Sequence, residues 1–365
     1  MIKILVFGIT ENPGGVESVI MNYYRSLDRE KIQFDFLCNT ETVAYETEIL
    51  QLGGTVYRIP ARRDERKAFF DALDQFMRDH ASEYHGIWVN VCSLANIDYL
   101  VYAKKYGISK RIIHCHNADN GDSFLRGLLH RFNRLRIRRV ATDFWSCSDE
   151  ASKWFYGAGM TKNLNYRYIT NAIDPGKFVM DKAVRADYRK KLSVEKKLVI
   201  GHIGRFHFQK NHRFVLEVFR EVRKLRSEAE LLLIGQGELT EEIKKAAETM
   251  GISDSVQFLG VRSDIPQLYQ AMDAFLFPSL FEGLPIVLLE AQANGLPCMI
   301  SDRITREIQV NSNLHQKSLD ESAKCWAESL IQIAEQEGRT DQTSFLNSSY
   351  NIEKQVKLLE ALLSA

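Results

Sequence analysis

Short, almost continuously apolar runs alternate with amphipathic stretches along the whole chain. Such runs are typical of parallel strands covered on both faces, and the stretches between them have the spacing of helices that pack on one side. The pattern predicts an α/β protein built on parallel sheets. The predicted strands are Ile2–Phe7, Phe34–Cys38, Val56–Ile59, Ile87–Val89, Arg111–His116, Phe144–Ser148, Tyr166–Thr170, Leu198–Ile203, Leu231–Ile234, Val256–Leu259, Ala274–Phe277 and Pro297–Ile300. Predicted helices include Gly15–Leu27, Lys67–His80, Ser123–Val140, Arg213–Arg226 and Ile352–Leu363.

The rhythm breaks once, and the break predicts two domains. Residues 171–176 have turn chemistry, and residues 181–197 are polar and basic without strong apolar periodicity. A length of 365 residues also fits two domains. We therefore expect an N-terminal domain over residues 1–171 and a C-terminal domain over residues 172–345. The final segment, residues 346–365, is expected to pack its amphipathic helix back toward the N-terminal domain.

Composition and charge exclude several classes of protein. With 45% hydrophobic and 26% charged residues, the chain is neither disordered nor fibrous. The net charge of +1 gives no case for a nucleic-acid partner. No apolar run reaches the roughly 18 residues that span a bilayer. Six scattered cysteines without metal or disulfide spacing favour reduced thiols, and hence a cytoplasmic protein.

The strongest local motif is Phe281–Ala291, which follows the predicted strand Ala274–Phe277 and enters a helix near Pro285. A helix start carries unpaired amides and partial positive charge, so it binds phosphate or sugar oxygens. Glu282 precedes this start and Glu290 lies about one and a half turns inside it. Taken singly, the two glutamates are expected to be a dipole partner and a solvated helix residue. Together, in a strand–loop–helix context, they favour a functional site.

Two loops at predicted strand ends add candidates in the same half. Residues 204–212 read Gly-Arg-Phe-His-Phe-Gln-Lys-Asn-His, and Arg205 and Lys210 could grip a diphosphate from two sides. A solvated loop with ordinary surface charges is the alternative. Gly235 and Gly237 lack the third glycine of a dinucleotide fingerprint, but they permit close approach of backbone to a nucleotide.

The N-terminal half offers two weaker candidates. Gly14 and Gly15 join the first strand to the first helix, where they allow either close ligand approach or merely a tight turn. His114 and His116 end a buried strand and lie on one face by strand alternation. We expect one of them to be structural and His116, nearer the strand end, to face a ligand. The chain contains no D-x-D pair, so no metal site is expected.

One basic helix stands out from the balanced charge of the chain. Ser123–Val140 holds six arginines and no acidic residue, with apolar residues at helical spacing. Because the total charge is only +1, the remainder of the chain is mildly acidic. Such a helix can lie on an anionic membrane surface. The alternative is a core helix with a solvated basic face.

Taken as a set, these motifs resemble a known family. Gly204-Arg205 with Lys210, the E-x7-E pair Glu282 and Glu290, and the glycine-rich first loop resemble the retaining family-4 glycosyltransferases of GT-B fold, over essentially the whole chain. The likeness is closest to transferases of bacterial capsule and exopolysaccharide biosynthesis. It implies two Rossmann-like parallel-sheet domains that face an interdomain cleft.

The resemblance also implies residue roles. Arg205 and Lys210 would hold the donor diphosphate, Glu290 the ribose, and Glu282 the transferred sugar, while His116 would face the reacting sugar and the acceptor. Catalytic roles thus fall on His116, Arg205, Lys210 and Glu282. The donor-binding positions that it implies are Gly14, Gly15, Gly235, Gly237, Val261, Arg262, Gly283, Leu284 and Glu290.

The implied reaction moves a sugar, with retention and without metal or cofactor, from a nucleotide-diphosphate sugar, expected to be a UDP-sugar. The acceptor would be a saccharide, expected to be linked to a polyprenyl diphosphate at the inner face of the plasma membrane. Two alternatives stay open. One is another enzyme of similar fold, a sugar-nucleotide epimerase or a phosphorylase, and the other is a non-catalytic two-domain sugar-nucleotide-binding protein.

Overall fold

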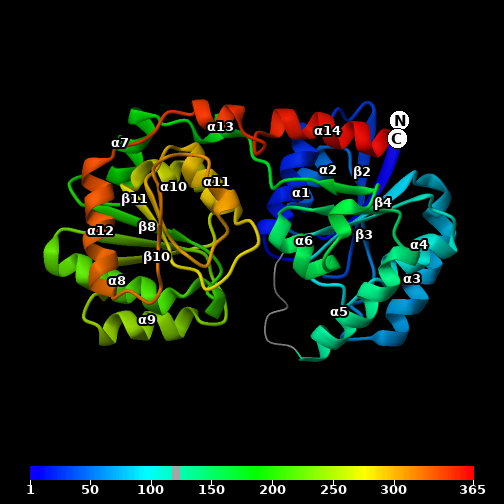
Figure 1. Cartoon of the computed structure of the whole chain (residues 1–365), viewed down its shortest axis with the longest axis horizontal. Coiled ribbons are helices and arrows are strands. Elements are labelled where there is room, and N and C mark those ends of the chain that lie inside the picture. Colours follow the sequence, from blue (N-terminus) through cyan, green and yellow to red (C-terminus); the bar gives the residue numbers. More distant parts are fainter. Residues whose placement is uncertain (117–123) are drawn as a thin grey trace. The chain divides into compact units, whose positions relative to one another are not determined.

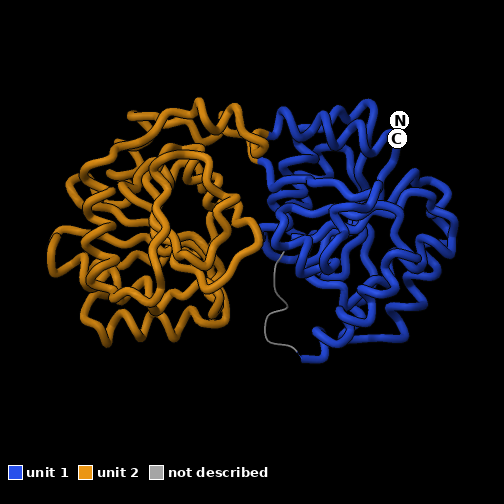
Figure 2. The backbone as a smooth tube through the Cα atoms, in the orientation of Figure 1, with its two compact units in different colours: residues 1–172, 352–365 blue, residues 173–351 orange. Residues whose placement is uncertain are grey.

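A computed structural model describes residues 1–116 and 124–365, which form two compact units (Figure 2). Unit 1 comprises residues 1–172 and 352–365, and unit 2 comprises residues 173–351. Each unit contains one parallel sheet with helices on both faces (Figure 1), so the predicted α/β class is confirmed. Ser123, the first residue of the predicted basic helix, lies outside the described residues.

The sheet of unit 1 has seven strands in the order β3-β2-β1-β4-β5-β6-β7, and all neighbouring pairs run parallel. The interior strand β1 is buried because apolar residues occupy both of its faces: Ile4, Leu5 and Val6 have no exposed surface. All seven strands were predicted, with ends shifted by at most two residues. The strands are β1 Ile2–Phe7, β2 Ile32–Cys38, β3 Val56–Arg58, β4 Gly86–Val91, β5 Lys110–Cys115, β6 Asp143–Ser146 and β7 Tyr166–Tyr168.

Helices cover this sheet, and the last helix of the chain belongs to the same unit. Helix α14 packs on α1, where the Glu360 carboxylate accepts a hydrogen bond from the Asp28 amide at 2.8 Å. A carboxylate there caps the end of the turn that follows α1. The helices of unit 1 are α1 Gly15–Ser26, α2 Glu46–Gln51, α3 Arg66–His80, α4 Asp98–Lys105, α5 Phe124–Arg136, α6 Asp149–Tyr156 and α14 Ile352–Ser364, with short 3-10 turns at η1 Ala81–Glu83, η2 Ile137–Arg139 and η3 Met160–Lys162.

The sheet of unit 2 has six parallel strands in the order β10-β9-β8-β11-β12-β13. Five of them were predicted. The edge strand β13 was missed because it reads Leu-His-Gln-Lys, with Leu314 its only apolar and only buried residue. The strands are β8 Val199–Ile203, β9 Glu230–Ile234, β10 Val256–Gly260, β11 Ala274–Phe277, β12 Cys298–Ser301 and β13 Leu314–Lys317.

Helices α8, α9 and α12 bury one apolar face against this sheet, and α7, α10 and α11 lie together on its other side (Figure 1). The large apolar side chains of α8, such as Val215 and Phe219, are fully buried there. The helices of unit 2 are α7 Lys182–Lys191, α8 His212–Leu225, α9 Thr240–Thr249, α10 Ile265–Ala271, α11 Ile286–Ala293, α12 Ala323–Gln336 and α13 Thr343–Asn347, with 3-10 turns at η4 Pro175–Phe178, η5 Phe208–Lys210, η6 Ser253–Ser255 and η7 Arg306–Ile308.

Helix α7 occupies the segment that lacked apolar periodicity in the sequence. It is attached to unit 2 by arginines rather than by an apolar stripe. Arg185 and Arg189 both form ion pairs with Asp273, and Arg189 also donates to the Ala271 carbonyl at 2.8 Å. Arg189 is buried, so its charge is offset by these partners. Because polar side chains attach α7 to its unit, the helix has no periodic apolar positions by which the sequence could predict it.

Two further findings bear on the class of protein. Among the described residues, no helix is both long enough and apolar enough to cross a membrane. The six cysteines are free thiols, and four of them are buried.

Candidate functional site

The topological switch point of unit 2 lies between β8 and β11, which are neighbours although the chain visits β9 and β10 between them. Ligands of open parallel sheets bind at the carboxyl ends of strands at such a point. The two loops that follow these strands are joined to each other. The Leu280 amide donates to the Gln209 carbonyl at 2.8 Å, and the Asn211 side-chain amide donates to the Pro278 carbonyl at 3.2 Å. The loops therefore form one rigid rim.

Lys210 and Glu282 meet on this rim. The Lys210 Nζ lies 2.6 Å from Glu282 Oε1, and the two side chains are only 16% and 7% exposed. Gln209 donates to the other carboxylate oxygen at 3.1 Å, and the Lys210 ammonium lies 4.6 Å from the centre of the Phe277 ring. The alternative of an ordinary solvated surface charge is therefore wrong for Lys210. The Lys210 ammonium and the Glu282 carboxylate thus lie in contact, and the Gln209 side chain also holds the carboxylate.

Helix α11 starts at the same rim. Pro285 is its N-cap residue, and Gly283 and Leu284 just before it are buried. Glu290 is the fifth residue of α11, about one turn from its start, and its carboxylate accepts a hydrogen bond from the Tyr269 hydroxyl at 3.1 Å. Burial raises the pKa of Glu290 to about 7, and the Tyr269 hydrogen bond partly opposes that rise. The expectation that Glu290, taken singly, is a solvated helix residue is therefore wrong.

Arg205 is directed to a different partner from Lys210. Its Nη2 lies 3.0 Å from Glu238 Oε2, and the His207 Nε2 lies 3.5 Å from the other Glu238 oxygen. The Arg205 side chain is 69% exposed. Glu238 was missed by the sequence reasoning, although it directly follows the Gly-Gln-Gly loop. In this structure Arg205 is therefore held by a carboxylate that an anionic ligand would have to replace.

Gly235 and Gly237 allow two loops of unit 2 to touch. Gly235 has φ +126°, and a Cβ atom there would lie 2.1 Å from the Gly204 carbonyl oxygen. A Cβ atom at Gly237 would lie 2.4 Å from the Phe206 carbonyl oxygen. The Phe206 amide donates to the Gln236 carbonyl at 3.1 Å, which closes the contact. The close contact between these loops thus requires glycine at positions 235 and 237 whether or not a nucleotide binds there.

Val261 and Arg262 follow β10, on the far side of β9 from the switch point. Val261 is exposed. Arg262 forms two hydrogen bonds with Asp264, at 2.8 and 2.6 Å, and Asp264 also accepts from the Tyr188 hydroxyl. Arg262 thus forms a local ion pair that an anionic ligand would have to replace, and the exposed Val261 side chain offers an apolar surface.

Unit 1 has its own switch point, between β1 and β4, and there Gly14 ends the loop after β1 and Gly15 is the first residue of α1. Gly14 is the N-cap of α1, and a Cβ atom there would lie 2.7 Å from Glu17 Oε2, whereas open space surrounds Gly15. The buried Glu17 carboxyl accepts from the Thr10 hydroxyl at 2.6 Å, and burial raises its pKa. Glu17 is a second polar group that the sequence reasoning did not select.

His116 also reaches this switch point, from the end of β5. Its Nε2 lies 2.9 Å from Asn90 Oδ1 at the end of β4, and burial lowers the pKa of His116 to about 4. The rings of His114 and His116 lie 4.1 Å apart, so they share one face as predicted. His114 is fully buried, with its Nε2 3.2 Å from the Ile169 carbonyl oxygen. His114 is therefore structural, and His116 is a neutral polar group beside Asn90.

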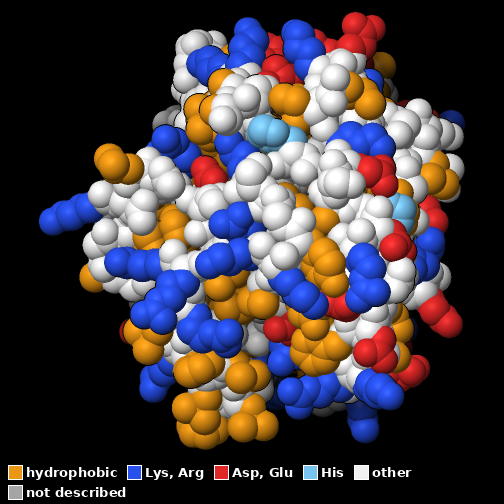
Figure 3. Space-filling view, turned by 90° about the vertical axis from the view of Figure 1, so that its right-hand side faces the viewer, with side chains coloured by type: hydrophobic (Ala, Val, Ile, Leu, Met, Phe, Trp, Pro, Cys, Tyr) orange, Lys and Arg blue, Asp and Glu red, His pale blue; other side chains and the backbone are white. Residues whose placement is uncertain are grey.

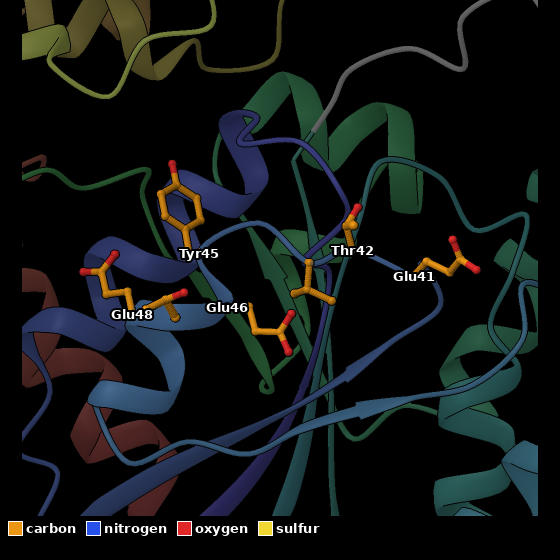
Figure 4. Close-up of a pocket in the computed structure, with 7 residues that line it drawn as sticks. Glu41, Thr42, Tyr45, Glu46 and Glu48 are labelled. Carbon is orange, nitrogen blue, oxygen red and sulfur yellow. The ribbon is translucent and has the colours of Figure 1, made fainter.

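A cavity of about 520 Å³ lies on the connection from β2 to α2 and is lined by residues between 41 and 48 (Figure 4). None of the predicted site residues lines it. Glu46 and Glu48 form ion pairs with Arg58 and Arg25, and the side chains labelled in Figure 4 point in different directions. The lining therefore does not converge on one ligand position.

The fold and the unit 2 rim define a class: two Rossmann-like units, one of which presents a cation, carboxylates and a helix start at its switch point. The family model "Glycosyl transferases group 1" matches residues 184–344. EpsF of Bacillus subtilis, a protein named as a glycosyltransferase, is 32% identical over 330 residues, which cover 88% of this chain and 85% of EpsF. The chain belongs to the glycosyl transferases group 1 family and is a glycosyltransferase.

Solved structures show the same fold, the GT-B fold that the resemblance implied. The Anabaena protein Alr3699/HepE, solved in complex with UDP and glucose, superposes with a TM-score of 0.84 at 18% identity, and each chain is fully covered. WaaG, a glycosyltransferase involved in lipopolysaccharide biosynthesis, gives a TM-score of 0.70 at 17% identity, with 99% and 97% coverage. A UDP-Gal:α-D-GlcNAc-diphosphoundecaprenol α-1,3-galactosyltransferase of Escherichia coli is 34% identical over 139 residues, 37% of this chain and 36% of the relative.

Proposed function

We propose that this glycosyltransferase is a retaining, family-4 enzyme that moves a sugar from a UDP-sugar to a saccharide carried on a polyprenyl diphosphate. The transfer requires no metal or cofactor and serves capsule or exopolysaccharide synthesis at the cytoplasmic face of the membrane. The observation that carries the proposal is the Lys210–Glu282 pair at the unit 2 switch point. The UDP and glucose bound to HepE and the UDP-Gal and diphosphoundecaprenol in the name of the E. coli relative support these substrate classes.

The reaction breaks the bond between the anomeric carbon and the diphosphate and forms one to an acceptor oxygen. The electron pair of the broken bond leaves with the diphosphate, and the acceptor proton passes to a leaving phosphate oxygen. Lys210 and Arg205 offset the charge that develops on the diphosphate, which stabilises the transition state more than the ground state. These two cations supply the charge compensation that a divalent metal would otherwise supply, so metal independence is part of the proposal.

The remaining residues bind and orient. Glu282, with the amides of Gly283 and Leu284 at the start of α11, holds hydroxyls of the transferred sugar, and Glu290 holds the ribose. Val261 lies against the base. The neutral His116 and the Gly14–Gly15 loop serve the acceptor and the reacting sugar, so residues 1–171 form the acceptor side and residues 172–345 the donor side.

The test is a panel of UDP-, GDP- and dTDP-sugars, each incubated with and without a polyprenyl-diphosphate-linked saccharide. We expect an acceptor-dependent product from a UDP-sugar, with the anomeric configuration of the donor by NMR, and undiminished in excess EDTA. Lys210→Met should abolish turnover, whereas the exposed Lys244→Met is the matched control. Release of an epimerised nucleotide sugar without acceptor, or binding of UDP-sugar without turnover, would contradict the proposal.

A further inference from the structure

Helix α5 of unit 1 is attached to its unit by polar side chains. The His130 Nδ1 accepts a hydrogen bond from the Leu94 amide at 3.1 Å, and the Asn133 side chain donates to the Leu94 carbonyl at 2.7 Å. Both side chains are buried, and the His130 ring lies 4.4 Å from the ring of Trp154. The buried face of this helix is therefore its polar face.

The apolar side chains of α5 consequently point outward. The alternative of a core helix with a solvated basic face is wrong, because six large apolar side chains are between 43% and 79% exposed. Contiguous exposed apolar surface of this kind marks an interaction site. Figure 3 shows the side of the molecule that lies on the right in Figure 1. Hydrophobic side chains gather at its lower end, at the level of α5. The exposed side chains are Phe124, Leu125, Leu128, Leu129, Phe132 and Leu135.

Arginines surround this apolar stripe and extend onto a second element. Helix α5 and the following turn contain no acidic residue. The Asp98 carboxylate interacts with Arg136 from α5, with Arg62 from the loop before α3 and with Arg66, the first residue of α3. One carboxylate thus offsets three guanidinium groups, and the excess charge is positive. The Lys104 ammonium adds a further charge, 2.6 Å from the Arg139 carbonyl.

We propose that this surface docks unit 1 on an anionic lipid bilayer. The α5 surface consists of the exposed apolar stripe with Arg126, Arg131, Arg136, Arg138 and Arg139, together with Arg62 and Arg66. The apolar side chains enter the boundary between headgroups and acyl chains, and the arginines bind lipid phosphates.

Charge and chemistry together select this occupant. A nucleic acid would use the arginines and leave the six apolar side chains in water. A second copy of the chain would place two arginine-rich surfaces against each other. An anionic bilayer satisfies both parts of the surface along a helix that is about 20 Å long. The inference does not require the reaction proposed above, because none of these residues belongs to the sites described for donor or acceptor.

The experiment is co-sedimentation of the full chain with vesicles of phosphatidylcholine alone or with added phosphatidylglycerol. We expect binding only to the anionic vesicles, weakened by salt. Leu125→Ser with Phe132→Ser should lower the partition coefficient at least tenfold, and so should Arg131→Glu with Arg138→Glu. Exposed residues elsewhere provide matched controls: Leu164→Ser in unit 1, and Lys324→Glu in unit 2, should leave binding unchanged.

Two results would overturn the proposal. One is absent or lipid-independent binding of the wild type, or equal binding by all variants. The other is a dimer in sedimentation velocity that the apolar variant dissociates, without vesicle binding by the wild type, which would assign the surface to a second copy. UDP-sugar turnover with a short, water-dispersed acceptor should be the same in wild type and α5 variants. Vesicle binding without any turnover would therefore reject the proposed reaction and leave the docking surface intact.

Discussion

The pH dependence of donor binding tests the role proposed for Glu290. Burial raises the pKa of this carboxyl to about 7, against the opposing hydrogen bond from the Tyr269 hydroxyl. Ribose hydroxyls donate hydrogen bonds to an ionised carboxylate, so a UDP-sugar that contacts Glu290 favours its charged form and lowers its pKa. A proton must then leave the protein as the ligand binds.

The size of the effect follows from that pKa. About one tenth of Glu290 is ionised at pH 6 and about nine tenths at pH 8, so the affinity for UDP-glucose should fall about tenfold from pH 8 to pH 6. At pH 7, binding should release about half a proton. UDP-glucose is the suitable probe because both of its phosphates are esterified and neither titrates in this range.

Isothermal titration calorimetry at pH 6, 7 and 8, in two buffers of different ionisation enthalpy, measures both the affinity and the released proton. Glu290→Gln should bind more weakly at pH 8, show a flat pH profile and release no proton. His207→Asn, which replaces a histidine on the loop after β8 that the proposal does not use, should keep the wild-type slope. A wild-type affinity that is constant from pH 6 to 8, or an equal slope in Glu290→Gln, would refute the reasoning.

Three further perturbations test other parts of the structure. Arg205→Ala should lower kcat about 10²–10³-fold with an unchanged circular dichroism spectrum, because one cation on the leaving diphosphate is lost; a wild-type rate would remove Arg205 from the mechanism. Glu238→Gln should lower the KM for the UDP-sugar by up to about fivefold, since an exposed ion pair worth up to about 1 kcal/mol no longer competes with the diphosphate; a raised KM would instead make Glu238 a ligand contact. Burial lowers the pKa values of His116 and His202 to about 4, so unfolding takes up protons below pH 6.5 and each histidine should cost about 2 kcal/mol of stability at pH 5 relative to pH 7. Because the raised pKa of Glu290 acts in the opposite direction over this range, the test compares variants with the wild type: a His202→Asn variant that loses as much stability in urea from pH 7 to pH 5 as the wild type would contradict this assignment.

The strands could be predicted from the sequence because burial on both faces imposes an uninterrupted apolar run. The same reasoning fails where an element is held by polar contacts. Helix α7 is anchored through the Asp273 carboxylate and β13 is an edge strand with one buried residue, so neither carries an apolar pattern. Helix α5 shows the limit most clearly. The sequence shows its apolar and its polar positions. Which of them are buried depends on the hydrogen bonds that His130 and Asn133 form with the backbone of Leu94, which no sequence pattern reveals.

The candidate site divides in the same way. Lys210 and Glu282 were selected from their positions after two strands, but their contact across 72 residues depends on β8 and β11 being neighbours, which strand patterns do not reveal. Glu238 was missed because a lone glutamate after a glycine loop has no distinguishing spacing. Gly235 was selected as a place where backbone approaches a nucleotide, which stays a prediction. Its contact with the Gly204 carbonyl of another loop has no signal in the sequence.

The two units use the same strand order around their switch points, but the groups at the switch point are neutral in unit 1 and charged in unit 2. In unit 1, burial raises the pKa of Glu17 and lowers that of His116, so the neutral form of each group is favoured. In unit 2, Lys210 and Glu282 stand as an ion pair, with Arg205 on the neighbouring loop. A diphosphate needs cations, whereas an acceptor hydroxyl can be held by neutral donors and acceptors. This difference favours unit 2 for the nucleotide and unit 1 for the acceptor, on grounds independent of any resemblance. Lys210→Gln removes the buried cation from the unit 2 switch point. It should therefore weaken UDP-sugar binding and leave the acceptor affinity unchanged, both measured by saturation-transfer NMR. An equal loss of both affinities would contradict the assignment of the nucleotide to unit 2 and the acceptor to unit 1.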